Sequence, residues 1–380
     1  MSDLLTRGVV ETVPKELAEK KLKSGKKLRV YLGIDPTGSH LHLGHAVPLR
    51  KLQAFCDAGH EVIFLIGSHT AMIGDPTGRD TMREPLTKKQ VIENFKTYKK
   101  QASKILNFSK IKIVFNDKWL SKLSAKDIMD IAGHFTIQQM LQRDMFKKRM
   151  KAGEDLSPNE FMYPLMQGYD SVELDVDCEI GGNDQLFNML CGRKLQKAYG
   201  KRDKFVLTTK LIEGTDGRKM SKTYDNCIYL DESANDMFGN VMRVNDDLME
   251  VYFECCTDVP MDEVKKILSG SPRDAKVRLA REIVTLYHSE KDADAAEANF
   301  DAVFKDGGVP DDIEVTKVSE GAKVIDVLVD KGLIASKSEA RRLVEQGGIK
   351  KNDKAIDSID AIAEPGIYKV GKRKFLKITL

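Results

Sequence analysis

The 380-residue sequence predicts an α/β fold in which helices cover both faces of a parallel sheet. Three short β-rich runs support this prediction, at residues 28–34 (LRVYLGI), 61–67 (EVIFLIG) and 111–115 (IKIVF). Helical patterns and loops with glycine and proline separate the runs, as in a sheet whose parallel strands are joined by helices. Ligands of such sheets bind beyond the carboxyl ends of the strands, where these loops would lie.

The segments between the runs follow a strand–loop–helix order. A turn cluster at residues 35–38 (DPTG) ends the first run, and a helical pattern then covers residues 42–58. A second loop of this kind, 74–78 (GDPTG), follows the second run, and a long helical stretch precedes the third. Each strand is therefore expected to reach the next through a helix, which is the usual crossover between parallel strands.

The pattern changes twice in the second half of the chain. From about residue 233 to 304 it is helical throughout, and residues 305–320 then become polar with glycine and proline, as in an exposed linker. A short helix is expected over residues 324–330. A second helix begins with a capping box, in which Ser336 is followed three residues later by Glu339, and strand-like stretches continue to the end.

These changes predict three domains and a linker. We expect an α/β domain over residues 1–224, an α-helical domain over 225–305 and a small α+β domain over 321–380, with a linker at 306–320. A chain of this length exceeds the size at which a single hydrophobic core usually stops growing, so several domains are expected.

The composition favours a soluble protein with a basic last domain. Apolar residues make up 41% and charged residues 31%, and no apolar run approaches the roughly 20 residues needed to cross a bilayer. The N-terminus lacks the zones of a signal peptide and the six cysteines show no paired spacing, so a cytoplasmic protein with reduced thiols is expected. Residues 321–380 hold 13 Lys and Arg against 8 Asp and Glu, whereas the whole chain carries only +3.

Three histidines, His40, His42 and His45, lie in residues 35–45 (DPTGSHLHLGH), between the first strand and the following helix, and Gly44 stands between the last two. Imidazoles at a helix N-terminus, beside free backbone N–H groups, can contact an anion such as phosphate, and the intervening glycine would let a flat base approach the backbone. No Walker motif or G-x-G-x-x-G fingerprint offers another nucleotide site. Histidines that merely cap a surface helix are the alternative, and a metal site is a weaker one because no third ligand is evident.

A basic loop with several glycines at residues 214–223 (GTDGRKMSKT) is the second candidate. Its lysines, Lys219 and Lys222, stand three residues apart in a segment without helical or strand period. Such a loop can close over a triphosphate and neutralise the charge that develops on departing pyrophosphate. Taken alone, the segment could equally be a solvated basic loop.

Together the two segments resemble the paired signatures of class I aminoacyl-tRNA synthetases, usually written HIGH and KMSKS. They read HLGH and KMSKT here, so each departs at one position while keeping an apolar residue or a hydroxyl. Residues 140–146 (MLQRDMF), 160–170 (EFMYPLMQGYD) and 181–185 (GGNDQ) resemble the tyrosine branch rather than the closely related tryptophan branch. The resemblance implies a Rossmann-like catalytic domain that activates L-tyrosine with ATP and loads it onto tRNA(Tyr).

The same resemblance implies roles for individual residues. Tyr31 and Asp170 would bind the phenolic hydroxyl of tyrosine, because a group that both donates and accepts a hydrogen bond needs one partner of each kind. The other residues implied for tyrosine are Asp75, Tyr163 and Gln167 at its ammonium group and Gln185 at its carboxyl end. Those implied for catalysis are Thr37, His42, His45, Lys219 and Lys222, and those for ATP binding are Gly33, Asp35, Gly44, Gly182, Asp184 and Met220.

Three positions depart from the tyrosine branch. Ser68 and His69 stand where an acidic and an aromatic residue are frequent, and Glu179 stands where the bacterial type often has glutamine, which leaves the contacts around the amino group and the ring open. A tryptophan-activating relative is disfavoured by Tyr31, Asp170 and the tail, which resembles an S4 domain. A non-catalytic RNA-binding paralogue is the second alternative, although it would be expected to have lost the paired histidines or lysines, all of which are present.

The last domain resembles the S4 domain, a small RNA-binding module, over residues 336–349 (SKSEARRLVEQGGI). A plain solvated helix is the alternative. The resemblance also implies that Mg²⁺ accompanies ATP and that the chain forms a homodimer, with residues 137–146 as a candidate interface. The residues expected to contact RNA phosphates are Lys337, Arg341, Arg342, Lys350 and Lys351.

Overall fold

The computed structural model describes residues 2–77, 86–221, 224–304, 314–319, 321–352, 354–371 and 374–379. The chain forms two compact units, Met1–Ala293 and Asp294–Leu380, and each has a β-sheet of its own. Over the described ranges, no helix combines the length and the apolar character that crossing a membrane requires.

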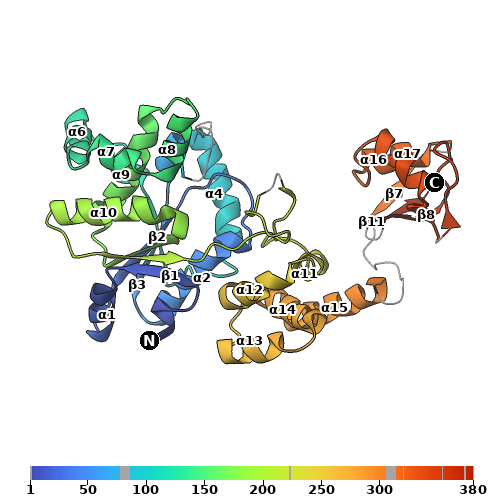
Figure 1. Ribbon diagram of the computed structural model, residues 1–380, viewed down its shortest axis with the longest axis horizontal. Coiled ribbons are helices and arrows are strands. Elements are labelled where there is room, and N and C mark those ends of the chain that lie inside the picture. Colours follow the sequence, from blue (N-terminus) through green and yellow to red (C-terminus); the bar gives the residue numbers. More distant parts are fainter. Residues whose placement is uncertain are drawn as a thin grey trace. The chain divides into compact units, whose positions relative to one another are not determined.

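A six-stranded sheet forms the centre of the first unit (Figure 1). Its strands are β1 (Val9–Val13), β2 (Arg29–Ile34), β3 (Glu61–Ile66), β4 (Lys112–Phe115), β5 (Cys178–Gly182) and β6 (Phe205–Thr209). They lie in the order β1-β6-β5-β2-β3-β4, and all pairs are parallel except that β1 runs antiparallel to β6 at one edge. The predicted α/β fold is therefore confirmed, with one antiparallel edge strand added.

The three strands predicted from apolar runs are present as β2, β3 and β4, and they lie side by side. The other three strands, β1, β5 and β6, were not predicted. All five residues of β1 are partly or fully exposed, so its sequence lacks the continuous apolar run of a buried strand. Strand β5 carries Glu179, a charged residue at a buried position, which conceals it in a search for apolar runs.

Helices cover both faces of this sheet. Figure 1 shows α9 and α10 on one side of the sheet and α1 and α2 on the other. On the α9 side, Tyr31 of β2 packs with Ile63 and Leu65 of β3 and with Leu174 at the end of α9. The helices are α1 (Lys15–Lys23), α2 (Leu43–Asp57), α3 (Thr70–Ile73), α4 (Lys88–Ala102), α5 (Asp117–Leu120), α6 (Ala125–Gly133), α7 (Ile137–Leu141), α8 (Asp144–Lys151), α9 (Pro158–Leu174) and α10 (Leu186–Ala198).

The region predicted to be purely helical is helical in the structure. Its elements are α11 (Ala234–Met242), α12 (Met249–Cys256), α13 (Met261–Leu268), α14 (Pro272–Tyr287) and α15 (Glu290–Phe304). Helix α14 packs against α11, α12 and α13, and its buried residues Leu279, Ile283 and Val284 recur at helical spacing. The domain edges expected near residues 224 and 305 remain predictions.

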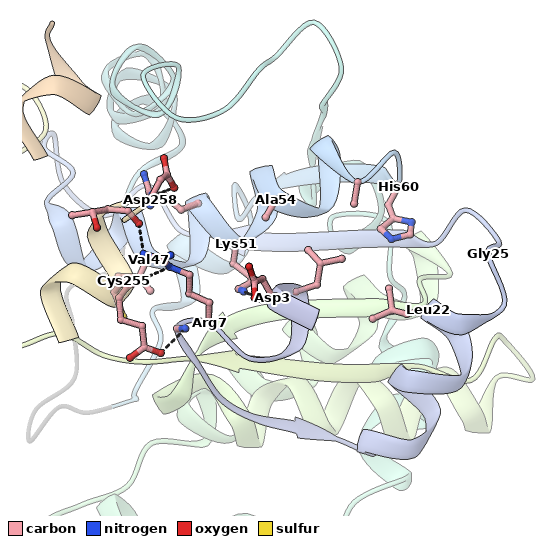
Figure 2. A pocket seen from close by; sticks show the side chains of 16 residues that line it. Asp3, Arg7, Leu22, Gly25, Val47, Lys51, Ala54, His60, Cys255 and Asp258 are labelled. Atoms are coloured by element: carbon pink, nitrogen blue, oxygen red, sulfur yellow. Dashed lines mark hydrogen bonds and ion pairs between the residues drawn. The ribbon is translucent and has the colours of Figure 1, made fainter. Parts of the chain in front are cut away.

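A cavity of about 670 Å³ lies where the N-terminal segment, α2 and the end of α12 meet (Figure 2). Lys51 lines it, and its Nζ donates to the carbonyl of Asp3 at 3.0 Å. Burial lowers the pKa of Lys51 to about 8. Arg7 donates to the carbonyls of Glu254 and Thr257 at 2.9 and 2.8 Å. These bonds tie the N-terminal segment to the helical region, and none of the residues predicted to bind tyrosine or ATP lines the cavity.

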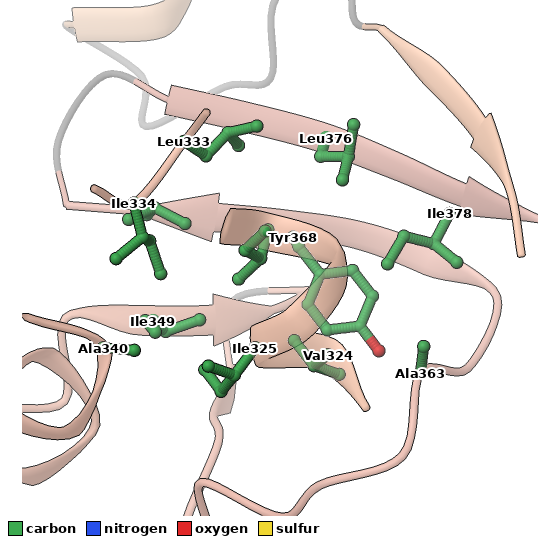
Figure 3. Close-up of a cluster of buried hydrophobic side chains, with 12 residues drawn as sticks. Val324, Ile325, Leu333, Ile334, Ala340, Ile349, Ala363, Tyr368, Leu376 and Ile378 are labelled. Carbon is green, nitrogen blue, oxygen red and sulfur yellow. The ribbon is translucent and has the colours of Figure 1, made fainter. Parts of the chain in front are cut away.

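The second unit contains a small mixed sheet in the order β7-β11-β10-β8-β9. Its elements are β7 (Val315–Lys317), α16 (Val324–Asp330), α17 (Lys337–Glu345), β8 (Ile349–Lys351), β9 (Lys354–Ala355), β10 (Gly366–Val370) and β11 (Lys374–Thr379). Both predicted helices are present, and the Ser336 Oγ accepts the N–H of Glu339 at 3.3 Å, as its capping role requires. Side chains including Leu328, Tyr368 and Leu376 form the core between helices and sheet (Figure 3).

Strand β7 lies inside the stretch expected to be a linker, so the sheet of this unit begins before residue 321. Its three residues alternate exposed, buried, exposed, and such a short strand gives no apolar run in the sequence. Residues 305–313 and 320 lie outside the described residues. The remaining extent of the linker therefore stays a prediction.

Candidate active site

Helix α2 begins at the double-histidine segment. His42 is its N-cap, and the His42 Nδ1 accepts the N–H of Gly44 at 3.2 Å. The backbone N–H of His42 in turn donates to the Nδ1 of His45 at 3.3 Å, and the two ring centroids lie 3.9 Å apart. Because both Nδ1 atoms accept, each neutral ring carries its proton on Nε2 and can donate from there.

Both imidazoles are neutral at physiological pH. Burial lowers the pKa of His42 to about 2, with a further contribution from the nearby His45, and burial lowers the pKa of His45 to about 4. The helix N-terminus supplies positive potential without a charged side chain. These two rings can therefore serve as uncharged hydrogen-bond donors to an anion.

The basic loop lies against the start of this helix. The N–H of Leu43 donates to the carbonyl of Ile228 at 3.0 Å, so the chain that leaves the loop pairs with the chain that enters α2. A Cβ placed on Gly44 would stand 3.0 Å from the His42 ring and 3.5 Å from the Sδ of Met220. Two segments that are far apart in the sequence are therefore adjacent, and the glycine allows their close approach.

Asn226 fixes the shape of the basic loop. Only 1% of this residue is exposed, and its Nδ2 donates to the carboxylate of Asp216 at 2.8 Å and to the carbonyl of Lys219 at 3.1 Å. Its Oδ1 accepts the N–H of Ser221 at 2.8 Å. A Cβ on Gly214 would stand 2.3 Å from the same Nδ2, so glycine is needed there for the asparagine to fit.

We expect Asn226→Ala to destabilise the loop, because the groups that it contacts would lose a buried partner at a cost of about 2 kcal/mol in the free energy of unfolding. Limited proteolysis should then cleave within residues 214–221 sooner than in the unmodified chain. Asn240→Ala is the matched control, since Asn240 is only partly buried in α11 and donates to Glu232, which precedes that helix. Equal cleavage of the loop in both variants would contradict this role of Asn226.

Lys219 is exposed, and Lys222, the second loop lysine, lies outside the described residues together with Thr223. Burial and the charge of Asp75 raise the pKa of Asp184, and the Lys219 ammonium acts in the opposite direction. Lys219 is therefore close enough to Asp184 to influence it, which brings the loop toward the carboxyl end of β5.

Tyr31 on β2 and Asp170 on α9 are both buried, with exposures of 1% and 2%. The two carboxylate oxygens of Asp170 accept the Nδ2–H of Asn116 at 3.1 Å and the Nε1–H of Trp119 at 2.8 Å. Burial raises the pKa of Asp170 well above its usual range, and these hydrogen bonds oppose that rise. Burial and the charges of Glu179 and Asp170 raise the pKa of Tyr31, so the tyrosine keeps its proton.

A chain of hydrogen bonds joins residues that were predicted to hold the amino and carboxyl groups of tyrosine. Gln185 Nε2 donates to Asp75 Oδ2 at 2.8 Å. The Nδ2 of Asn188 lies 3.0 Å from the Oε1 atoms of both Gln185 and Gln167 and donates to them. The structure thus brings Asp75, Gln167 and Gln185 together through Asn188, which the sequence did not single out.

Asp35 organises the carboxyl end of β2. Its Oδ2 accepts the hydroxyl of Tyr163 at 2.9 Å and its Oδ1 accepts the hydroxyl of Thr70 at 2.7 Å. The N–H of Thr37 donates to the Asp35 carbonyl at 2.8 Å, which closes the turn after the strand. Burial, followed by the charge of Asp35, raises the pKa of Tyr163 well above its ordinary value, so this phenol also stays protonated.

Two predicted glycines lie in the strands that lead to this edge. Gly33 is exposed in β2 and Gly182 is the last residue of β5. A Cβ on Gly182 would stand 2.7 Å from the Asp184 Oδ1 and 3.0 Å from the Leu211 side chain. Glycine at this position therefore lets the carboxylate of Asp184 lie close to the backbone.

The departures at Ser68 and His69 belong to the network around Asp170. The Ser68 hydroxyl donates to Asp117 Oδ1 at 3.0 Å, and the backbone N–H of His69 donates to Asn116 Oδ1 at 2.8 Å. Because the amide oxygen of Asn116 is occupied in this way, its amide nitrogen faces Asp170. The third departure, Glu179, forms a buried ion pair with Lys204.

Sequence reasoning missed several residues that shape this site. Most of them make their decisive contact with a residue distant in the sequence, whereas Asn226 contacts its own loop, and no local pattern marks them. They are Asn116, Trp119, Ser171, Asn188, Lys204 and Asn226.

In the second unit, two of the five basic residues expected to contact RNA form ion pairs within the protein. Arg341 and Arg342 are exposed on α17, and Lys350 is exposed on β8. Lys337 pairs with a carboxylate of α16 at 2.6 Å, and Lys351 pairs with the glutamate at position 364. Their role toward RNA remains a prediction.

Comparisons with known proteins agree with this arrangement. The model of the family described as tRNA synthetases class I (W and Y) matches residues 23–305. Tyrosine–tRNA ligase of Photobacterium profundum is 46% identical over 99% of this chain and 97% of that protein, and tyrosine–tRNA ligase of Thermotoga maritima is 43% identical over 99% and 96%.

Solved structures give the same result. A C-terminally truncated mitochondrial tyrosyl-tRNA synthetase of Coccidioides posadasii superposes with a TM-score of 0.63 and 31% identity, over 78% of this chain and 90% of that one. The tyrosyl-tRNA synthetase of Archaeoglobus fulgidus complexed with L-tyrosine shares the fold, with a TM-score of 0.62 and 21% identity over 77% and 98% of the two chains. The chain therefore belongs to the tyrosine–tRNA ligases, within the class I tRNA synthetases for tryptophan and tyrosine.

Proposed function

We propose that this chain activates L-tyrosine with ATP to tyrosyl-adenylate and pyrophosphate, and then transfers the tyrosyl group to the 3′-terminal adenosine of tRNA(Tyr). The observation that carries the proposal is the contact between the double-histidine helix start and the basic loop, on the sheet that also carries Tyr31. The family and the relatives named above support the same activity.

The first step needs no covalent nucleophile and no general base, because the tyrosine carboxylate is already ionised when it attacks the α-phosphorus of ATP. Catalysis is then positioning and stabilisation of charge. Thr37 and the Nε2–H groups of His42 and His45 would contact the phosphates. Lys219 and Lys222 would close over the leaving pyrophosphate, and Mg²⁺ would enter as part of the ATP substrate, bound to its phosphates.

The adenosine part of ATP would lie over the carboxyl ends of β2 and β5. Gly33 and Gly44 would let the base and sugar approach the backbone, and Asp184 would hold the ribose hydroxyls. Gly182 supports this role, because it leaves room for the Asp184 carboxylate beside the strand. Met220 would face the same nucleotide from the loop, where its sulfur lies near Gly44. Asp35 would act on the turn that carries Thr37.

Tyrosine would enter with its ring toward the buried end of the site. Its hydroxyl would donate to Asp170 and accept from Tyr31, both of which are buried and offer those functions. Its ammonium group would contact Asp75, Tyr163 and Gln167. Its carboxylate would contact Gln185.

The remaining proposals concern RNA, assembly and compartment. We propose that α11–α14 and the basic residues of the second unit hold tRNA during the second step, with Arg341 and Arg342 at its phosphates. A homodimer through residues 137–146 is supported by the exposed side chain of Ile137, 71% of which is accessible. The six free, buried cysteines suit the reducing cytoplasm, the compartment that we propose.

Pyrophosphate exchange into ATP, measured separately with each of the twenty amino acids, tests the proposal. We expect exchange with tyrosine to exceed every other amino acid by at least about 100-fold, since one buried donor and one buried acceptor would be left unpaired by a side chain without a hydroxyl. Exchange driven by tryptophan would assign the chain to the sister specificity, and no exchange with any amino acid would contradict the enzyme activity.

A further inference from the structure

A buried ion pair lies behind the tyrosine site and has no role in the reaction proposed above. The side chains of Lys204 and Glu179 are 0% and 3% exposed, and they contact each other. Burial lowers the pKa of Lys204, and the charge of Glu179 opposes this. The attraction between two buried charges rarely exceeds the free energy that both lose with their hydration, so such a pair adds little stability. Its presence therefore indicates a role in orienting the groups around it.

The lysine reaches Tyr31 through one intermediate residue. Lys204 Nζ donates to the Ser171 Oγ at 2.5 Å, and the same Oγ lies 3.0 Å from the Tyr31 hydroxyl and 3.4 Å from Glu179 Oε2. The Nζ also stands 5.7 Å from the centroid of the Tyr31 ring. A Cβ on Gly192 of α10 would stand 2.5 Å from the Ser171 Oγ and 2.7 Å from the Nζ, so this glycine makes room for both groups.

Donor and acceptor counts give these hydrogen bonds a direction. An ammonium group can only donate, so the Ser171 oxygen accepts from Lys204 and has a single proton of its own to give. That proton has two acceptors within reach, and the Tyr31 oxygen is nearer than the Glu179 oxygen. When Ser171 donates to Tyr31, the proton of Tyr31 points away from Ser171, where the Glu179 carboxylate accepts it in the free protein and a bound phenol would compete for it.

We propose that Lys204 and Ser171 are positioning residues that set the direction of the Tyr31 hydroxyl, so that it donates to the phenolic oxygen of tyrosine. The order of donation then runs from Lys204 to Ser171, to Tyr31, to the substrate hydroxyl and finally to Asp170. A group that only donates stands at one end and a carboxylate, which accepts, stands at the other. The pair thereby contributes to the choice of tyrosine over phenylalanine, and this inference rests on the proposed role of Tyr31 and Asp170.

Ser171→Ala tests the inference in the full-length chain. Tyrosine- and phenylalanine-dependent pyrophosphate exchange should be measured, and the ratio of the two kcat/KM values compared with the unmodified chain. We expect kcat/KM for tyrosine to fall about 10-fold while that for phenylalanine stays unchanged, because only the hydroxyl uses the directed donor. A residue with a merely structural role would lower both values together.

Tyr31→Phe and the double variant Ser171→Ala/Tyr31→Phe separate this inference from the proposed site. If Ser171 acts through Tyr31, the double variant should lose no more preference for tyrosine than Tyr31→Phe alone. Loss of preference in Tyr31→Phe with full preference in Ser171→Ala would overturn the inference and leave the proposed site intact. Unchanged preference in Tyr31→Phe would overturn both.

A second route guards against poor folding of Ser171→Ala, which circular dichroism would reveal. Lys204→Met combined with Glu179→Leu replaces both charges by apolar side chains of similar size, an exchange that buried ion pairs often tolerate. Ser171 would then lack the donor that fixes its direction. The ratio of kcat/KM for tyrosine to that for phenylalanine should fall, and an unchanged ratio in this variant would also overturn the inference.

Discussion

Asp170→Asn is expected to remove most of the preference for tyrosine over phenylalanine. Both oxygens of Asp170 accept N–H groups, from Asn116 and Trp119. An amide has only one acceptor oxygen, so its NH₂ group would face a donor, and the substrate hydroxyl would lose its acceptor. Leaving buried polar groups without their hydrogen bonds costs about 2–3 kcal/mol, on the order of a 100-fold fall in kcat/KM for tyrosine.

The measurement is pyrophosphate exchange with tyrosine and with phenylalanine, since the second substrate reports on damage unrelated to the hydroxyl. Asp175→Asn is the matched control, because Asp175 ends the same helix, its side chain is 30% exposed, and its left-handed backbone conformation (φ 45°) is one that asparagine tolerates. The control should keep both rates within about two-fold. If Asp170→Asn kept the full preference for tyrosine, recognition of the hydroxyl would have to lie elsewhere.

Lys219→Ala should lower kcat for tyrosine-dependent exchange by about 100-fold and leave the KM for tyrosine nearly unchanged. The reason is that the ammonium would meet charge that develops only as pyrophosphate leaves, and removal of one such stabilising donor typically costs this much. The backbone carbonyl of Lys219 accepts a hydrogen bond from the Nδ2 of Asn226, and this bond fixes the position of the backbone from which the lysine side chain extends.

Arg218→Ala is the adjacent control for that experiment. Arg218 is exposed, pairs with Asp216 at 2.5 Å and lies over the ring of Tyr224, with its Cζ 4.4 Å from the centroid, so its charge is already engaged away from the site. Its removal should change kcat by less than about three-fold. Equal losses in the two variants would mean that the loop responds to total charge and that Lys219 has no specific role.

The sequence predicted those parts of the fold that have a local signature. Strands β2, β3 and β4 are apolar runs, and α2 follows a turn of glycine and proline, so each could be identified without knowledge of its neighbours. Strand β1 could not, because what makes it a strand is its pairing with β6, where Val9 lies opposite Thr209. Pairing over such a separation leaves no trace within either segment.

The candidate site divides in the same way. The paired histidines and the basic loop stand out in the sequence as compact motifs, and the structure brings the two segments together. Trp119 could not have been predicted as a site residue, because its indole N–H contributes to the site only by donating to Asp170, which lies 51 residues further along the chain. Glu179 stood out as a departure, yet its partner Lys204 looked like any surface lysine until β5 and β6 placed the two charges together.

The backbone hydrogen bond from the N–H of Leu43 to the carbonyl of Ile228 limits how the basic loop can move. One end of the loop is held by this hydrogen bond, and the other is held just before the loop, where the carbonyl of Glu213 accepts the hydroxyl of Tyr252 of α12 at 2.6 Å. A segment held at both ends has few conformations to lose, so the closure over ATP proposed above would carry only a small entropic penalty.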